Sequence, residues 1–536
     1  MRKRRNPAFV CIGFGPPIDA ASPAELGFKA YNLWRMTTLG LAVPPAFVLP
    51  TAWCRDYLKE PGILSAALVE NVLAGIRLLE QETGLGFGSP RRPLLVSVRS
   101  GAPVSMPGMM ETLLDIGLND ESVHGLIRLT GNPRLAWDSY ARLVERYAIV
   151  VHRCRAERFA EIAARIVDER GAANRRELDF AGHAALVRAF IDAFEGETES
   201  LFPQEPRVQL ETALRAVFES WLAPKAAEYR RLNGLDDALG TAVTVQRMVY
   251  GNAGGTSGAG VGFTRNPASG VRELYLDFRF NAQGEDIVAG THDADDAALL
   301  GKLLPDVHAE LDAVAEKLER AFGDVQEFEF TVHEGALHLL QTRTAKRTPW
   351  AALRIAVEQV AEGLITPKAA LARLEGIDLA SLRSVRLRPS AETPCLAHAI
   401  PAGVDAASGP IALDVAAARR FAAAGKPPIL VRAECSTEDI AGFAVSAGIL
   451  TATGGRTSHA AVVARQLGRV CLVGCQSLSV DLARRSCALG GSTLAEGSVI
   501  TLDSATGSIY AGAVETADER PTAWLAEVER WRAAHG

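Results

Sequence analysis

The chain has 536 residues, with 57 Lys or Arg and 63 Asp or Glu, so its formal net charge at pH 7 is −6. This mild acidity argues against a dedicated nucleic-acid-binding protein, which needs an excess of basic side chains to neutralise phosphates. Hydrophobic residues make up 48% of the chain and charged residues 22%. That composition is typical of globular proteins and excludes a largely disordered chain.

Neither a membrane span nor a disulfide framework is expected. The longest apolar stretch without charges, residues 441–455, is rich in Gly, Ala, Ser and Thr and is too short to cross a bilayer. Basic residues 2–5 precede a short apolar run, which we interpret as the lead-in to a first strand rather than as a signal peptide. The 8 cysteines show neither C-x-x-C nor metal-finger spacing, so we expect reduced thiols in a cytoplasmic protein.

The N-terminal half mixes strands with a long helical region. The proline-fixed segment 43–50 and the β-branched run 93–99 predict two strands. From about Thr112 to Asn233 apolar residues recur at helical spacing, most clearly over 135–151 and 208–232. The pattern therefore predicts a block of helices inserted between strands.

Strands return after Gly240, and a second compact unit follows a helical pair. The predicted strands lie at 242–250, 271–280, 325–332, 337–341, 429–431, 447–451, 470–473 and 499–502. The turn signal His333-Glu334-Gly335 joins two of them as a hairpin. Residues 348–383 predict a connecting helical pair, and residues 520–536 predict an amphipathic helix.

The sequence around His459 is the clearest chemical signal. Gly454 and Gly455 permit a tight turn, and Thr457 and Ser458 lead into a helix that begins at His459. A helix N-terminus offers unpaired N–H groups and a positive dipole end, which suit a phosphoryl group on this histidine. Imidazole is also a good nucleophile near neutral pH. We therefore interpret His459 as a phosphoryl carrier.

Two further patterns indicate a nucleotide site. The Gly-rich loop 251–260 follows a strand, and such loops let backbone N–H groups approach phosphates, although this one lacks the P-loop spacing. Glu327 and Glu329 alternate along one predicted strand, and Gln341 and Arg343 alternate along its partner, so each pair faces one side. Paired carboxylates invite a divalent cation, and hard oxygen ligands favour Mg²⁺.

The His459 segment closely resembles the phosphohistidine motif of the phosphoenolpyruvate-utilising enzymes, above all the pyruvate, phosphate dikinase family. The resemblance extends over nearly the whole chain. Further matching segments, in order, are Ser97-Val98-Arg99-Ser100-Gly101-Ala102, Ser105-Met106-Pro107-Gly108-Met109-Met110, Trp137-Asp138-Ser139-Tyr140, Tyr229-Arg230-Arg231-Leu232-Asn233, Phe263-Thr264-Arg265-Asn266-Pro267, residues 283–290 and Leu340-Gln341-Thr342-Arg343.

The resemblance implies a multidomain fold of the α/β and α+β classes. It predicts an ATP-grasp nucleotide-binding domain over residues 1–349, with a helical insertion at about 112–240. A helical linker over 350–386, a swivelling phosphohistidine domain over 387–513 and a C-terminal helix over 514–536 follow. The dikinases continue into a (β/α)₈ barrel that holds pyruvate or phosphoenolpyruvate, and we expect this chain to lack it.

The resemblance also assigns roles to individual residues. His459, Arg343 and Thr457 would be catalytic, and Glu329 and Gln341 would bind Mg²⁺. The expected nucleotide-binding residues are Lys29, Arg99, Gln246, Met248, Val249, Glu327, Glu329 and Gln341. Two positions depart from the family: Glu327 stands where Asp is usual, and Asp277 stands where Glu is common.

The implied reaction is dikinase-type phosphotransfer from ATP and inorganic phosphate, with no nucleic acid or membrane involved. His459 would take the β-phosphoryl of ATP as a pyrophosphoryl group and release AMP. Phosphate would then remove the terminal phosphoryl as pyrophosphate, and the remaining group would pass to an acceptor held elsewhere. Alternatives are a subunit of a split dikinase with a barrel partner, a phosphotransferase for another small hydroxyl compound, and a non-catalytic regulatory remnant.

The C-terminal helix could contribute to acceptor docking. Trp524, Leu525, Val528 and Trp531 form one apolar stripe on this predicted helix. We expect the stripe to pack back on the phosphohistidine domain, and the alternative is that it docks a partner protein bearing the acceptor.

Overall fold

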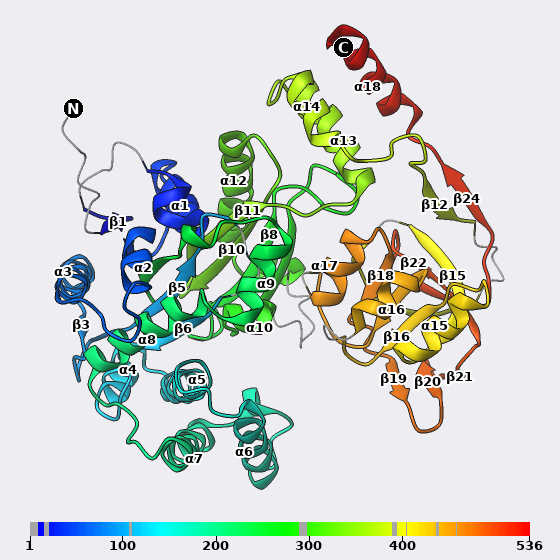
Figure 1. The fold of residues 1–536 in the computed structure, drawn as a ribbon. Helices are drawn as coiled ribbons and strands as arrows, with labels where there is room; N and C mark the ends of the chain where they lie inside the picture. Colours follow the sequence, from blue (N-terminus) through cyan, green and yellow to red (C-terminus); the bar gives the residue numbers. More distant parts are fainter. Residues whose placement is uncertain are drawn as a thin grey trace. The chain divides into compact units, whose positions relative to one another are not determined.

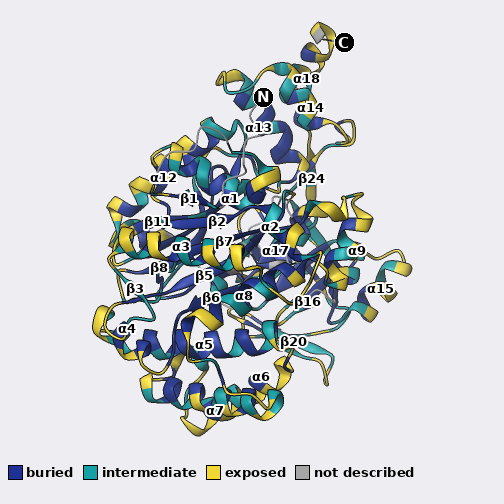
Figure 2. Ribbon diagram, turned by 60° about the vertical axis from the view of Figure 1, so that its left-hand side comes forward, coloured by how far each residue is buried: buried dark blue, intermediate teal, exposed yellow. Residues whose placement is uncertain are grey.

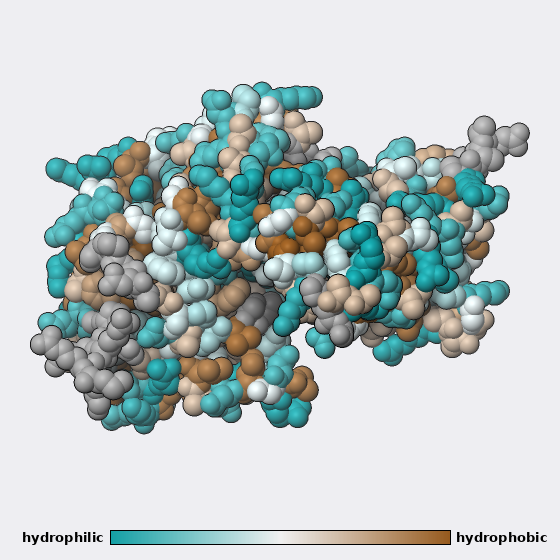
Figure 3. Space-filling model, turned by 90° about the horizontal axis from the view of Figure 1, so that it is seen from above, coloured by the Kyte–Doolittle hydropathy of each residue, from teal (hydrophilic) through white to brown (hydrophobic). Residues whose placement is uncertain are grey.

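The computed structural model describes residues 9–15, 21–104, 106, 110–288, 297–388, 394–403, 405–435, 439–456 and 458–535 (Figure 1). Its contacts divide the chain into two compact units, of which the first comprises residues 1–254 with 338–341 and the second residues 255–337 with 342–536. None of the described helices combines the length and apolar character that crossing a bilayer requires. Figure 3 shows one face, on which hydrophobic side chains lie in separate patches among hydrophilic ones.

The first unit is built on a five-stranded antiparallel sheet of order β1-β2-β7-β5-β6. Its strands are β1 (Val10–Ile12), β2 (Ala46–Leu49), β5 (Val96–Gly101), β6 (Thr112–Ile116) and β7 (Ala242–Arg247). The short parallel pair β3 (Gly86–Phe87) and β4 (Pro93–Leu94) stands beside it. Every residue of β2 is buried, and its four apolar side chains fill both faces of the strand. The strands expected within 43–50 and 93–99 and after the basic lead-in are confirmed.

Helices surround this sheet, and most of their buried side chains join one core (Figure 2). They are α1 (Pro23–Thr38), α2 (Thr51–Tyr57), α3 (Ala66–Thr83), α4 (Ser122–Thr130), α5 (Pro133–Val151), α6 (Ala156–Glu169), α7 (Phe180–Thr198), α8 (Pro206–Ser220) and α9 (Pro224–Leu232). The helical region starts at Ser122 rather than at Thr112, because the preceding residues pair as β6. The stretch 208–232, expected to be helical, is divided between α8 and α9 and breaks before Pro224, which lacks the N–H that a helix interior needs.

The second unit begins with a four-stranded sheet of order β11-β10-β8-β9. Its strands are β8 (Gly258–Phe263), β9 (Tyr275–Phe280), β10 (Gln326–His333) and β11 (Ala336–Thr344), accompanied by α10 (Gly284–Val288), α11 (Ala297–Leu303) and α12 (Pro305–Phe322). The hairpin is confirmed, with Glu334 and Gly335 at φ 50° and 81°. Strand β9 starts later than expected, because its register pairs Tyr275 with Phe263, the last residue of β8.

The helical pair and the C-terminal helix form one small cluster. Helices α13 (Pro349–Ala361), α14 (Pro367–Leu374) and α18 (Thr522–His535) share a core that includes Val528 and Trp531. The Trp350 and Trp524 rings meet edge to face at 5.3 Å between centroids. The apolar stripe therefore packs on α13 and α14, and the expectation that it packs on the phosphohistidine domain is wrong. The apolar faces of these three helices cover one another.

Between β12 (Ser384–Leu387) and β24 (Thr516–Glu519), which pair with each other, the chain forms a separate α/β domain. Its eight-stranded sheet has the order β13-β23-β22-β15-β16-β17-β18-β14, with β15 to β18 parallel. Its elements are β13 (Cys395–His398), β14 (Ile400–Pro401), β15 (Ala406–Ala412), α15 (Val415–Ala423), β16 (Ile429–Arg432), α16 (Ile440–Val445), β17 (Gly448–Thr451), α17 (His459–Gln466), β18 (Val470–Val473), β19 (Leu478–Asp481), β20 (Ser486–Leu489), β21 (Ser492–Ala495), β22 (Val499–Asp503) and β23 (Ser508–Ala511).

Candidate functional site

In the first unit, a close backbone contact brings Lys29 to the end of strand β5. Gly27, at φ 72°, interrupts α1, and a Cβ there would lie 1.8 Å from the carbonyl oxygen of Gly101. Only glycine tolerates this approach. The Phe28 N–H donates to the Ala102 carbonyl at 2.8 Å. As a result, the Lys29 Cβ lies 3.9 Å from the position that a Cβ on Gly101 would occupy.

Arg99 lies on the same face of β5, because it stands two residues before Gly101. Its Nη1 donates to the Leu340 carbonyl at 3.3 Å, one residue before the buried Gln341. Three residues predicted to bind nucleotide, Lys29, Arg99 and Gln341, thus gather around one end of this strand. Two cations beside a glycine-lined strand end form an arrangement that can accept phosphate oxygens.

Three further residues predicted to bind nucleotide, Gln246, Met248 and Val249, lie on β7 and just after it. The Gln246 side chain is buried and donates to the Pro44 carbonyl at 3.0 Å. The Met248 N–H donates to the Leu95 carbonyl at 2.9 Å. The side chains of Met248 and Val249 are partly exposed. Their contact with a base stays a prediction, and Gln246 already has a structural partner.

In the second unit, the carboxylates of β10 face the guanidinium of Arg343. The Arg343 Nη2 donates to Glu327 Oε1 at 2.5 Å, and one third of the Arg343 side chain is exposed. Burial lowers the pKa of Arg343, but the ion pair with Glu327 and the nearby charge of Glu329 outweigh it and raise the pKa above its usual value. Arg343 is therefore a fixed cation held in place by Glu327.

The strand register shows which residues share this face of the four-stranded sheet. Glu327 pairs with Phe263, which pairs with Tyr275, so these three form one cross-strand row. Glu329 and Asp277 both pair with Val261 and form the next row on the same face. The opposite face carries Phe rings, which lie over the glycines of β8. The predicted charged residues and Asp277 thus lie on one side of the sheet.

The loop before His459 lies on this face. A Cβ on Gly455 would lie 2.6 Å from Asp277 Oδ2, so glycine is needed for the approach. The Arg456 guanidinium lies 4.8 Å from the centre of the Tyr275 ring and donates to the Leu276 carbonyl at 3.3 Å. The Tyr275 hydroxyl donates to the Pro401 carbonyl at 3.1 Å, which adds a second contact with the same domain.

Helix α17 begins at His459 as predicted. The Ser458 side chain caps it by accepting a hydrogen bond from the Ala461 N–H. At its other end, Arg465 is 2% exposed, lies over the Phe263 ring and donates from Nη2 to the Arg456 carbonyl at 2.7 Å. Thr457 and the His459 side chain lie outside the described residues. The structure therefore supports the helix start but leaves the role of the imidazole a prediction.

Sequence reasoning missed Arg456, Arg465 and Tyr275. One signal was available: an arginine directly after a glycine pair, in a loop meant for an anion, has no acidic neighbour to balance it. The aromatic partner could not have been found, because Tyr275 lies 181 positions away in the sequence and meets the loop only in the folded chain.

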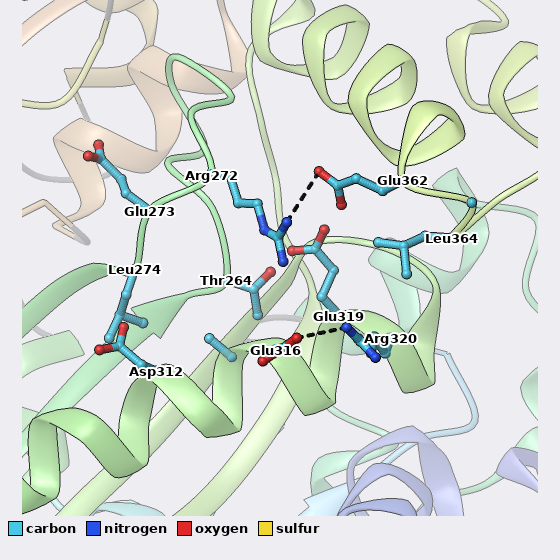
Figure 4. A pocket seen from close by; sticks show the side chains of 12 residues that line it. Thr264, Arg272, Glu273, Leu274, Asp312, Glu316, Glu319, Arg320, Glu362 and Leu364 are labelled. Carbon is cyan, nitrogen blue, oxygen red and sulfur yellow. Dashed lines mark hydrogen bonds and ion pairs between the residues drawn. The ribbon is translucent and has the colours of Figure 1, made fainter.

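A cavity of about 690 Å³ elsewhere in the second unit has none of the predicted residues in its lining (Figure 4). Its wall includes Glu316, Glu319 and Glu362. Glu319 and Glu362 bind the fully buried Arg265 at 2.7 and 2.6 Å. Among the described residues no group of three or more His, Cys, Asp or Glu side chains could hold a metal ion. The acidic wall is thus largely committed to ion pairs within the protein.

Comparisons with known proteins match both halves of the chain. Residues 61–310 match the pyruvate phosphate dikinase AMP/ATP-binding domain, and residues 425–507 match the PEP-utilising enzyme mobile domain, which contains His459. The pyruvate, phosphate dikinase of Clostridium symbiosum is 42% identical over 512 residues, which cover 94% of this chain and 58% of that protein. The enzyme of Rhizobium meliloti is 41% identical over 519 residues, covering 95% and 58%.

Pyruvate, phosphate dikinase 2 of Zea mays is 41% identical over 493 residues, which cover 91% of this chain and 55% of that protein. The chain therefore spans a little more than half the length of these curated relatives. The identity runs through both matched domains in the same order. By its AMP/ATP-binding domain and its mobile domain, the chain belongs to the pyruvate, phosphate dikinase family.

Proposed function

We propose that the chain catalyses the two nucleotide-dependent partial reactions of a dikinase. The His459 imidazole attacks the β-phosphorus of ATP, the bond from that phosphorus to the AMP oxygen breaks, and AMP leaves. Inorganic phosphate then attacks the terminal phosphorus of the pyrophosphorylated histidine and leaves as pyrophosphate. A single phosphoryl group remains on His459, ready for a further acceptor.

One observation carries this proposal: within the second unit, the loop that leads into His459 lies on the sheet face that holds Arg343 and Glu327. The contacts of Arg456 with Tyr275 and Leu276 fix this placement. Phosphoryl transfer asks little covalent work of a protein beyond positioning and charge compensation. The carrier loop, which contacts β9, and the fixed guanidinium on β11 lie on one sheet face and serve these two requirements.

The remaining roles follow the same electrostatic logic. We assign Lys29 and Arg99 to the phosphate oxygens of ATP and Arg343 to the charge that develops on the transferring group. Glu329 and Gln341 offer hard oxygens, which fit Mg²⁺ bound mainly through nucleotide phosphates. When bound, Mg²⁺ would neutralise charge on the triphosphate. Glu327 orients Arg343, and we assign Thr457 to the carrier loop as a residue that contacts the phosphoryl group.

The finer architecture belongs to this proposal as well. We propose an ATP-grasp domain over 1–349 with a helical insertion at about 112–240, a helical linker over 350–386, a swivelling phosphohistidine domain over 387–513 and a C-terminal helix over 514–536. The final acceptor would be bound outside the two matched domains. It would be either a group held by a separate acceptor-domain protein or a free small molecule. The reaction would take place in the cytoplasm.

Isotope exchange between ATP and AMP tests the first partial reaction by itself. With Mg²⁺ and without phosphate, labelled AMP should enter ATP, because formation of the pyrophosphorylated histidine is reversible. Exchange should stop when the metal is removed with a chelator. Absence of exchange in the folded, Mg²⁺-supplied protein, or exchange between ATP and ADP in its place, would contradict the proposal.

A further inference from the structure

Two arginines beside the carrier helix hold their charge without a carboxylate. Arg456 rests on the Tyr275 ring and the Leu276 carbonyl, and Arg465 donates to the Arg456 carbonyl. The Nε–H groups of both are buried without a hydrogen-bond partner among the described residues. In the part of the chain that the structure describes, neither guanidinium has a carboxylate within ion-pair distance, although the Asp277 carboxylate lies beside the loop at Gly455.

Arg465 is buried and Arg456 is half-buried, and this arrangement is unusual for cations withdrawn from solvent. A buried charge is ordinarily paired, because its desolvation is costly. Arg265 shows the ordinary solution in the same unit, with three carboxylates around one guanidinium. Ring faces and neutral carbonyls compensate Arg456 and Arg465 only partly, so an anion that arrived nearby would be attracted to both.

The carrier histidine supplies such an anion. His459 stands three residues after Arg456 and six before Arg465, with both arginines joined through the Arg456 carbonyl. A phosphoryl group adds a charge of about −1.5 to −2 near pH 7 and three acceptor oxygens. Charge-assisted hydrogen bonds to these oxygens are stronger than the bond that Arg456 makes to the neutral Leu276 carbonyl.

We propose that Arg456 is a phosphoryl-sensitive latch, a deduction that rests on the proposed role of His459. In the unmodified chain its guanidinium holds the carrier loop on Tyr275 and Leu276. Once His459 carries a phosphoryl group, the guanidinium turns to the phosphoryl oxygens, and the loop loses its main polar tie to the four-stranded sheet. Arg465, whose Nη2 donates to the Arg456 carbonyl, holds the backbone of the loop during this exchange of partners. Phosphorylation would thereby release the loop after the chemistry that requires contact.

Hydrogen exchange of the loop tests the latch, with peptides covering residues 452–456 and 440–451 as reporter and reference. Phosphoramidate, which phosphorylates histidines chemically, serves as the donor, so the test does not depend on the ATP reaction. In the wild-type protein, modification should raise exchange at 452–456 several-fold and leave 440–451 unchanged. The His459→Asn variant, treated in the same way, should show no rise.

Variants then separate the latch from a merely structural contact. Arg456→Gln should show the raised exchange before modification and little further rise after it. Arg456→Lys, which keeps the charge without the planar stacking group, should retain part of the response. Arg469→Gln is the matched control, because Arg469 also donates to a carbonyl, that of Ala444, and also has a buried, unpartnered Nε. It should behave like the wild type.

Two results would overturn the latch: wild-type exchange in Arg456→Gln before and after modification, or no change in the wild-type loop when His459 is verifiably phosphorylated. A protein whose loop opens with phosphoramidate but that incorporates no label from ATP would support the latch and contradict the proposed function. Failure of the two ideas is thus distinguishable.

Discussion

Arg265 and Arg343 lie in the same unit and both bind glutamates, yet their surroundings differ in kind. Arg265 is fully buried and binds Glu319, Glu358 and Glu362 at 2.7, 2.9 and 2.6 Å. It joins the end of β8 to α12 and α13. Arg343 forms an ion pair with one glutamate, Glu327, and keeps one third of its side chain exposed.

The difference teaches that a matching motif and a dense ion-pair network do not by themselves mark a reactive position. Arg265 belongs to one of the segments by which the sequence resembles its family, but its Nε, Nη1 and Nη2 atoms all bind glutamates inside the protein. Arg343 keeps part of its side chain accessible on the sheet face that the carrier loop contacts. Incomplete pairing and access, rather than charge density, separate the two.

The largest effect should come from the carrier residue. His459→Ala should abolish exchange between ATP and AMP and all protein labelling, because no other group can hold the transferred phosphoryl. Thermal unfolding should stay near that of the wild type, since one substitution at a helix start seldom decides stability. Label remaining at the wild-type level on this variant would contradict the assignment.

Arg265→Ala should lower the stability of the fold and leave the catalytic rate nearly unchanged. Removing it leaves three carboxylates close together with no cation, and breaking such a buried cluster costs about 3–5 kcal/mol. The thermal midpoint of the second unit should fall, while exchange per folded molecule at low temperature stays close to that of the wild type. Loss of exchange without loss of stability would erase the contrast with Arg343.

Arg343→Ala should show the converse pattern. Loss of a preorganised donor should lower the rate by on the order of 10²-fold or more, equivalent to about 2.7 kcal/mol. Nucleotide binding and thermal stability should change much less. The measurement is kcat for exchange beside the dissociation constant for ATP, and equal losses in the two would mean that Arg343 acts in the ground state.

A buried pair in the first unit, His183 and Asp138, makes stability depend on pH. His183 is 1% exposed, with its Nδ1 3.6 Å from Asp138 Oδ1, and burial lowers its pKa to about 4 although Asp138 works in the opposite direction. The unfolded chain, with an ordinary histidine pKa near 6.5, then binds more protons between those values. This contribution to stability is present above about pH 6.5 and is lost as the pH falls towards 4.

At pH 5 the loss should be about 2 kcal/mol, visible as a drop of a few degrees in the thermal midpoint of the first unit relative to pH 7. His183→Leu removes the titrating group and should show a smaller drop between the same two pH values. An identical pH dependence in variant and wild type would mean that His183 does not titrate in this window.

Much of the fold could be predicted from local pattern, and the long-range contacts could not. Alternation and β-branched runs identified most strands of both sheets but missed β6 and β8, because the first lies at the start of the expected helical region and the second overlaps the Gly-rich loop. The glycine pair before His459 identified the start of α17. The break at Pro224 was visible in the sequence and was passed over because the apolar spacing continues through it. The packing of Trp531 on α13 and α14 and the seat of Arg456 on Tyr275 needed the folded chain, since helical periodicity shows an apolar face but not its partner.

The direct test of the central claim is the fate of the two outer phosphorus atoms of ATP on the protein. The purified chain is incubated with Mg²⁺ and with ATP labelled at either the β or the γ position, before and after inorganic phosphate is added. The label should be labile in acid and stable in base. Both labels should bind before phosphate is added, and afterwards only the β label should remain, while the γ label leaves as pyrophosphate. A γ label that stays on the protein after phosphate, or a β label that never binds, would contradict the dikinase mechanism.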